Sequence, residues 1–207
     1  MFKNITLILN CVLVTIALNA QVNKPSKKVL FLGNSYTSVN NLPLIISTLA
    51  TSAGDSLVYD FNLQGGFRLY DHYNDFNSKF KIAKGDWDYV VLQEQSQLPS
   101  FPMADVAKDV LPFAAGLNQL IKDANPCTIT QFYMTWGRKN GDSSNCATWP
   151  PVCTYRGMDS LLQLRYHLMA NYNRAELSPV GAVWNYLRSN FPSIELYQSD
   201  ESHPSLA

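Results

Sequence analysis

The sequence has no excess of charge of either sign: 16 Lys and Arg residues balance 16 Asp and Glu residues in a chain of 207. Without a positive field nothing draws the chain to a phosphate backbone, so binding of nucleic acid is not predicted. Charged residues are only 15% of the total and hydrophobic residues are 46%, a composition that excludes an intrinsically disordered chain. The length suits a single domain.

Metal-binding patterns are also missing. The chain has three His and four Cys residues, and none of them forms a Cys-x-x-Cys motif or a His pair with ligand spacing. Structural and catalytic zinc sites are built from such groups. We therefore predict neither a metal nor another cofactor.

The first twenty residues differ in character from the rest. Lys3 supplies a positive charge, residues 5–18 are nearly all apolar, and Ala20 is small. This pattern is typical of a secretory signal peptide, and the apolar run is shorter than the roughly 20 residues that a membrane span needs. We predict export to the periplasm or the medium, no membrane span in the mature chain, and one domain over residues 21–207. A lipid anchor on Cys11 is an alternative that the sequence leaves open.

Export allows the remaining cysteines to form a disulfide. Cys146 and Cys153 enclose a segment that is polar and then rich in proline, with little core of its own. A bridge would restrict its freedom, so we predict that these two residues are paired. Cys127 lies in a predicted strand, where we expect a free, buried thiol.

Strands and helices alternate along the rest of the chain. Short apolar runs predict strands at 28–32, 56–63, 87–92, 127–135 and 193–198. Helical spacing predicts helices at 42–53, 68–84, 103–124, 157–173 and 179–190, with a break at Pro112 in the third. This alternation indicates a parallel sheet covered on both faces, and hence a three-layer α/β/α domain with about five strands.

Polar groups follow the predicted strands, and in such sheets the chemistry lies at the carboxyl ends of the strands. The segments there are 33–37, 64–68, 93–97, 136–138 and 199–204. Together they supply a hydroxyl, small backbone donors, amides, and a carboxylate three residues before a histidine. Acyl transfer needs these groups as nucleophile, oxyanion donors, orienting acid and base.

Two of these segments resemble the motifs of the SGNH (GDSL-like) hydrolases. Gly33-Asn34-Ser35 is similar to the family's nucleophile turn, and Asp200-x-x-His203 is similar to its C-terminal motif. The resemblance implies a flavodoxin-like SGNH hydrolase fold and an esterase of a secreted bacterial subgroup. It also implies a further helix after the histidine motif. The printed sequence stops before such a helix, which is either absent or beyond it; without the helix, an apolar face of the sheet would be exposed.

The resemblance also implies roles for single residues. Ser35 would be the nucleophile, His203 the base and Asp200 the group that orients the base. The oxyanion would be bound by the N–H groups of Ser35 and Gly66, with Gly65 as an alternative to Gly66, and by a side-chain amide. In the family that amide belongs to a Gly-x-Asn-Asp block, which Gln93-Glu94-Gln95-Ser96 replaces here.

Gln95 is our choice for this amide, although the sequence does not decide among the glutamines. The other two histidines, His72 and His167, are expected on helices in structural or surface positions. Because the base must be neutral, the rate should rise through one ionisation near neutrality and then level off.

The substrate is predicted only as a class. Export and the aromatic or cationic residues expected at the rim, Trp136, Trp149, Tyr155 and Arg156, favour small acyl esters on a glycan. A lipid ester or a thioester is an alternative. Two other functions compete with an esterase: a glycan-binding protein on a decayed hydrolase scaffold, and a flavodoxin-like nucleotide binder. The oligomeric state is not predicted.

Overall fold

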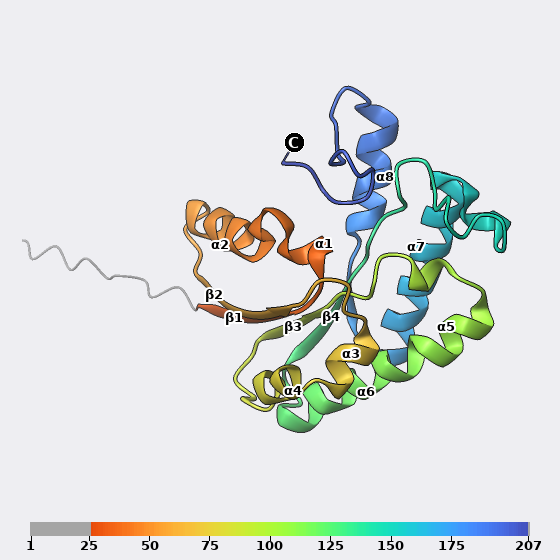
Figure 1. The fold of residues 1–207 in the computed structure, drawn as a ribbon. Coiled ribbons are helices and arrows are strands. Elements are labelled where there is room, and N and C mark those ends of the chain that lie inside the picture. Colours follow the sequence, from red (N-terminus) through yellow and green to blue (C-terminus); the bar gives the residue numbers. More distant parts are fainter. Residues whose placement is uncertain (1–25, 207) are drawn as a thin grey trace, which may run out of the picture.

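The computed structural model describes residues 26–206, and the predicted signal peptide over residues 1–20 lies outside that range. Its centre is a sheet of five parallel strands in the order β2-β1-β3-β4-β5. These are β1 (Lys27–Gly33), β2 (Leu57–Leu63), β3 (Tyr89–Leu92), β4 (Ile129–Tyr133) and β5 (Glu176–Ser178). Helices lie on both sides of the sheet (Figure 1). The predicted three-layer α/β/α fold with about five strands is confirmed.

The two strands that carry the sheet's centre, β1 and β3, are apolar because both of their faces are covered. Every residue of Val29–Gly33 and of Val90–Leu92 is buried. Successive side chains of a strand point to opposite faces, so a strand covered on both sides shows a continuous apolar run instead of an alternation. This explains why both strands are readable in the sequence.

The helices form two unequal layers. One face of the sheet is covered by α1 (Ser35–Ser38), α2 (Leu42–Ser52) and α8 (Val180–Asn190), and the other by α3 (Leu69–Asn74), α4 (Phe76–Ile82), α5 (Met103–Asp109), α6 (Leu111–Ala124) and α7 (Tyr155–Asn173). Short 3-10 turns lie at Val39–Asn41, Leu98–Ser100 and Pro150–Cys153. The core on the α3–α7 side is largely aliphatic. The core on the α1, α2 and α8 side is largely aromatic.

Two of the predicted helices are divided. The helix expected over 68–84 is two helices, because Asp75 adopts an extended backbone and its carboxylate accepts a hydrogen bond from the N–H of Ser78. Aspartate favours such caps over helix interiors. The helix expected over 103–124 is divided as predicted: α5 ends before Val110, and Pro112 lies in the first turn of α6, where its missing N–H costs nothing.

The last predicted strand is wrong. Residues 193–198 form no strand, and within 191–206 the only pairing is an isolated antiparallel bridge between Tyr197 and Pro204. The fifth strand is instead β5, three residues between α7 and α8 that are too short to show a pattern. Leu196 and Tyr197 look like strand residues because they are buried, but they pack against Trp184 and its neighbours.

The face under α1, α2 and α8 is incompletely covered. A hollow of about 430 Å³ lies against it, and most of its lining is apolar. The apolar side chains come from the strands, from α2 and from the start of α8: Val29, Phe31, Leu42, Ile46, Leu57, Tyr89, Val91, Tyr133 and Val180. The strand residues Val29, Phe31, Val91 and Tyr133 that line this hollow are themselves buried, so the hollow exposes little of the sheet. Among residues 26–206, no helix has the length and apolar character to cross a membrane.

The cysteines are arranged partly as expected. Cys146 and Cys153 form a disulfide, with their Cα atoms 4.6 Å apart. Cys127 is free, but it is exposed and precedes β4, so the prediction of a buried thiol within a strand is wrong. The cause is local: the Asn125 side chain accepts a hydrogen bond from the N–H of Cys127, which makes the segment a turn.

Candidate active site

Ser35 is the first residue of α1, and only Asn34 separates it from the end of β1. The preceding Asn34 caps the helix, because its Oδ1 accepts a hydrogen bond from the N–H of Tyr36 at 3.0 Å. Tyr36 and Thr37 are buried, whereas Ser35 is only half-buried. The short Gly-Asn-Ser motif thus ends the strand, starts the helix and leaves the Ser35 hydroxyl accessible at the carboxyl end of the sheet.

A buried amide holds this turn from the neighbouring strand. Gln93, the first residue after β3, accepts hydrogen bonds from the Asn34 N–H at 3.0 Å and the Thr37 hydroxyl at 2.9 Å. Its Nε2 donates to Asn34 Oδ1 and to the carbonyl of Glu94. A Cβ on Gly33 would lie 2.7 Å from Gln93 Oε1, so this close approach needs glycine. Sequence reasoning missed this role of Gln93; the only available signal was its place directly after β3.

The structure brings Ser35, His203 and Asp200 together. His203 Nε2 lies 2.8 Å from Ser35 Oγ, and its Nδ1 is hydrogen-bonded to the carboxylate of Asp200. The other carboxylate oxygen of Asp200 accepts hydrogen bonds from the N–H groups of Ser202 and His203, both at 3.0 Å. Burial alone would raise the pKa of Asp200, but these hydrogen bonds lower it to about 2. Asp200 is therefore charged at neutral pH.

The segment that carries Asp200 and His203, residues 198–205, is held from outside; we call it the acid–base loop. Trp136 Nε1 donates to the carbonyl of Ser202 at 3.1 Å, and the Tyr36 hydroxyl lies 2.5 Å from Ser202 Oγ. The Trp136 ring is stacked between Tyr36 and Trp184, with centroid distances of 4.8 and 4.0 Å. Trp136 is only 1% exposed, so the expectation that it lies at a rim is wrong: it is a buried support.

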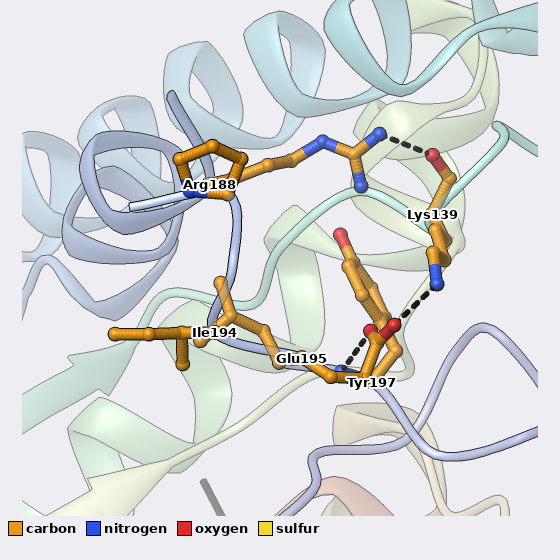
Figure 2. Close-up of a pocket in the computed structure, with 7 residues that line it drawn as sticks. Lys139, Arg188, Ile194, Glu195 and Tyr197 are labelled. Carbon is orange, nitrogen blue, oxygen red and sulfur yellow. Dashed lines mark hydrogen bonds and ion pairs between the residues drawn. The ribbon is translucent and has the colours of Figure 1, made fainter. Parts of the chain in front are cut away.

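A second support lies behind the acid–base loop. A cavity there has a volume of about 290 Å³. Its lining includes Lys139, Arg188, Glu195 and Tyr197 (Figure 2). Arg188 donates to the carbonyl of Lys139 at 2.7 Å, and Lys139 Nζ lies 2.6 Å from the carboxylate of Glu195. Lys139 and Glu195 thus form an ion pair, and Arg188 is bound to the backbone beside them. The N–H of Lys139 also donates to the carbonyl of Glu201 at 2.9 Å, so this group of residues contacts the acid–base loop.

Two backbone N–H groups are available for an oxyanion. Within residues 26–206, neither the N–H of Ser35 nor that of Gly66 has a hydrogen-bond acceptor. Gly66 lies in a turn closed by a hydrogen bond from Phe67 N to the carbonyl of Gln64, and its φ of +75° favours glycine. The Asn34 amide donates to the carbonyl of Phe67 at 2.8 Å, which links this turn to that of Ser35.

The glutamines after β3 differ in their free donors. Both amide hydrogens of Gln93 are engaged, so it has none to offer an oxyanion. Gln95 Oε1 accepts hydrogen bonds from the N–H groups of Gln97 and Leu98, and its Nε2 donates one hydrogen to Gln97 Oε1. One amide hydrogen of Gln95 is left. The assignment of Gln95 as a donor remains a prediction that is compatible with these contacts.

The other histidines lie away from the triad. His72 is fully buried; its ring nitrogens contact Ser78 Oγ at 2.8 Å and the Gly33 carbonyl at 2.9 Å, and burial lowers its pKa. His167 is exposed on α7. Among residues 26–206, no group of three or more His, Cys, Asp or Glu side chains is arranged to hold a metal ion.

No family model matches the chain, and no curated protein matches it either. Solved structures do. A DUF4886 family protein from Bacteroides uniformis has a TM-score of 0.71 at 17% identity, over 88% of this chain and 78% of that one. An acetyl xylan esterase has a TM-score of 0.59 at 16% identity, over 86% and 91% of the two chains. AlinE4, an SGNH-hydrolase family esterase, has a TM-score of 0.53 at 14% identity, over 88% of each chain. The resemblance to the SGNH hydrolases is confirmed at the level of the fold.

Proposed function

We propose that this chain, which has the SGNH hydrolase fold, is an exported serine esterase that removes small acyl groups from glycans. The observation that carries the proposal is the hydrogen-bonded chain from Ser35 through His203 to Asp200 at the edge of the sheet. Nucleophile, base and orienting carboxylate in this order are the arrangement of serine acyl-transfer enzymes. The solved structures that are similar to this chain in fold include an acetyl xylan esterase and other esterases.

The chemistry follows from the tautomer of His203. The charged Asp200 carboxylate can only accept a hydrogen bond from His203 Nδ1, so Nδ1 carries the proton and Nε2 is free to accept one from Ser35 Oγ. As that proton moves, Ser35 Oγ attacks the ester carbonyl carbon and the carbonyl oxygen becomes an oxyanion. The charged imidazole that forms is stabilised by the Asp200 carboxylate.

The oxyanion is bound by the N–H groups of Ser35 and Gly66 and by the amide of Gln95. Each such donor typically contributes on the order of 3 kcal/mol in the transition state. When the tetrahedral intermediate collapses, the bond to the alcohol breaks, and His203 returns its proton to that leaving oxygen. Water then attacks the acyl-Ser35 ester, again with His203 as base, and releases the acid and free Ser35.

The open position of these groups favours a large alcohol. The His203 side chain is 27% exposed and that of Asp200 46%, so the base and its carboxylate lie at the surface of the protein. A bulky, hydrated alcohol such as a glycan can approach there without entering a cavity. The Cys146–Cys153 disulfide supports export, because disulfides persist in oxidising compartments.

The test is ester hydrolysis with a variant of the nucleophile. Purified protein is assayed with p-nitrophenyl acetate and with acetylated xylan, and a phosphonate inhibitor is used to label the nucleophile. Ser35→Ala should lower kcat/KM by at least about a thousandfold, the scale seen when a triad member is lost. The labelled peptide should contain Ser35.

Ser38→Ala is the matched control, because Ser38 is an exposed serine of the same short helix and should leave the rate unchanged. Near-normal turnover by Ser35→Ala would contradict the proposal. Binding of xylan without hydrolysis or labelling would favour the decayed glycan-binding protein instead.

A further inference from the structure

Glu94 is a fully buried acidic side chain at the end of β3. Its Oε1 accepts hydrogen bonds from the N–H of Gln95 at 2.5 Å and the N–H of Leu69 at 3.2 Å. Its Oε2 is also buried, and no group within residues 26–206 donates to it. An ionised carboxylate with one unpaired oxygen is costly in such surroundings, because burial removes the water that would stabilise its charge.

The charges that face Glu94 oppose one another, because Arg68 lowers the pKa of Glu94 and Asp71 raises it. Arg68 and Asp71, at the start of α3, are paired with each other at 2.9 Å. From α7, Tyr166 contributes a buried phenol whose pKa is itself raised by burial. Burial likewise raises the pKa of Glu94 to about 8. At pH 7 the group is therefore a neutral carboxylic acid, whose Oε1 still accepts hydrogen bonds.

Glu94 joins two segments of the oxyanion site. Leu69 is three residues after Gly66, on the segment that follows β2, and Gln95 is the next residue after Glu94 itself. One carboxyl oxygen thus receives backbone N–H groups from the Gly66 side and from the Gln95 side. The neighbouring Gln93 binds the turn of Ser35. Two consecutive residues at the end of β3 therefore contact all three segments that carry the proposed oxyanion donors.

We propose that Glu94 is a positioning residue, which as a neutral acid fixes the Gly66 and Gln95 segments relative to Ser35. This inference rests on the proposed function, because it concerns the same oxyanion site. Loss of the Glu94 proton would place a negative charge with one unpaired oxygen between the two segments that carry Gly66 and Gln95. The rate should then fall again on the alkaline side, around pH 8, instead of levelling off as the sequence alone suggests.

The rate test compares two variants. Glu94→Gln keeps a neutral side chain with an acceptor oxygen, so its kcat at pH 7 should stay within about threefold of the parent and the alkaline fall should disappear. Glu94→Ala removes the shared acceptor, and kcat should fall on the order of a hundredfold with little change in KM, as for a misplaced catalytic group. Thr130→Val is a control for a buried polar side chain without a partner, away from the site.

A stability test is independent of activity. In the unfolded chain Glu94 ionises near its ordinary pKa of 4.5, whereas in the folded protein it keeps its proton up to about pH 8. The contribution of Glu94 to the free energy of unfolding is therefore fully present below pH 4.5 and is lost as the pH rises to about 8. As the pH rises over this interval, the Tm of the parent protein should therefore fall relative to the Tm of Glu94→Gln.

The possible failures are distinguishable. If the Tm of Glu94→Gln and that of the parent changed in parallel with pH, Glu94 would not be a neutral acid in the folded protein. That conclusion would hold whatever the protein hydrolyses. Parent-like turnover by Glu94→Ala, or an alkaline fall that persists in Glu94→Gln, would overturn the positioning role while Ser35 still labels. Normal turnover by Ser35→Ala would overturn the proposed function, and the positioning role with it.

Discussion

The two segments that form the candidate active site are held in different ways. The turn of Ser35 lies between β1 and α1, and its neighbours Gly33, Asn34 and Thr37 are buried against Gln93. The acid–base loop has no regular structure beyond one bridge, and its Asp200 is exposed. The nucleophile therefore lies between a strand and a helix that the Gln93 side chain links, whereas the base lies on an irregular loop that Tyr36 and Trp136 contact from other elements.

This difference has an energetic consequence. Contacts of a loop that depend on single hydrogen bonds are each worth about 1 kcal/mol, so the acid–base loop can be loosened by one substitution. The turn of Ser35 shares the stability of the sheet and should be the last part of the site to open. Substitutions in the two segments should therefore separate loss of activity from loss of fold.

The largest effect in the acid–base loop is expected for Asp200→Asn. The amide removes the negative charge that stabilises the imidazolium and favours the wrong tautomer of His203, so kcat should fall about a hundredfold to ten-thousandfold. The fold should be unchanged, because Asp200 is exposed. Steady-state kinetics and circular dichroism check both points.

Glu201→Gln is the control for Asp200→Asn, since it removes a charge from the same loop at the adjacent residue and keeps an acceptor for Asn140. Its rate should match that of the parent. An equal loss in both variants would mean that overall charge, not the contact with His203, determines the rate.

A smaller effect is expected for Trp136→Phe. The ring can still stack between Tyr36 and Trp184, but the hydrogen bond to the Ser202 carbonyl is lost. We expect about 1 kcal/mol lower stability, from the lost hydrogen bond, and a fall in kcat of about tenfold, from a looser acid–base loop.

The matched variant is Trp149→Phe, which removes a similar indole hydrogen bond to the carbonyl of Ser100, outside the triad. Denaturant unfolding should show a similar loss of stability in both variants, and kinetics should show a slower rate only in Trp136→Phe. If both variants were equally slow, Trp136 would have no special part in holding His203.

The smallest effect on the rate is expected for the double variant Cys146→Ser/Cys153→Ser. The bridge closes a short loop, so its loss should cost about 2 kcal/mol of stability through the freedom of the unfolded chain. Within residues 26–206 the side chains of Ser35 and His203 make no hydrogen bond to the bridged segment, so kcat/KM should change less than about twofold. Thiol titration of the native parent without residues 1–20, and hence without Cys11, should detect Cys127 alone; a second reactive thiol would contradict the pairing.

The elements that could be predicted are those with a strong local signal. β1 and β3 are continuous apolar runs, and α7 repeats its buried residues at helical spacing. β5 could not be predicted, because it has three residues and becomes a strand only through pairing with β4. The strand expected at 193–198 reflects burial against aromatic rings of α8 and of the segment after β4, which a sequence pattern does not distinguish from burial in a sheet.

The candidate active site likewise has parts that local sequence predicts and parts that it does not. By itself, the sequence determined the two short motifs, because Gly-Asn-Ser caps a helix and Asp-x-x-His closes its own hydrogen bonds within three residues. Only the tertiary structure decided what surrounds them. Ser35 and His203 are 168 residues apart, and Gln93 reaches Asn34 across 59. Such contacts depend on strand order and on which loops meet at the sheet edge, and no local pattern of residues encodes that arrangement.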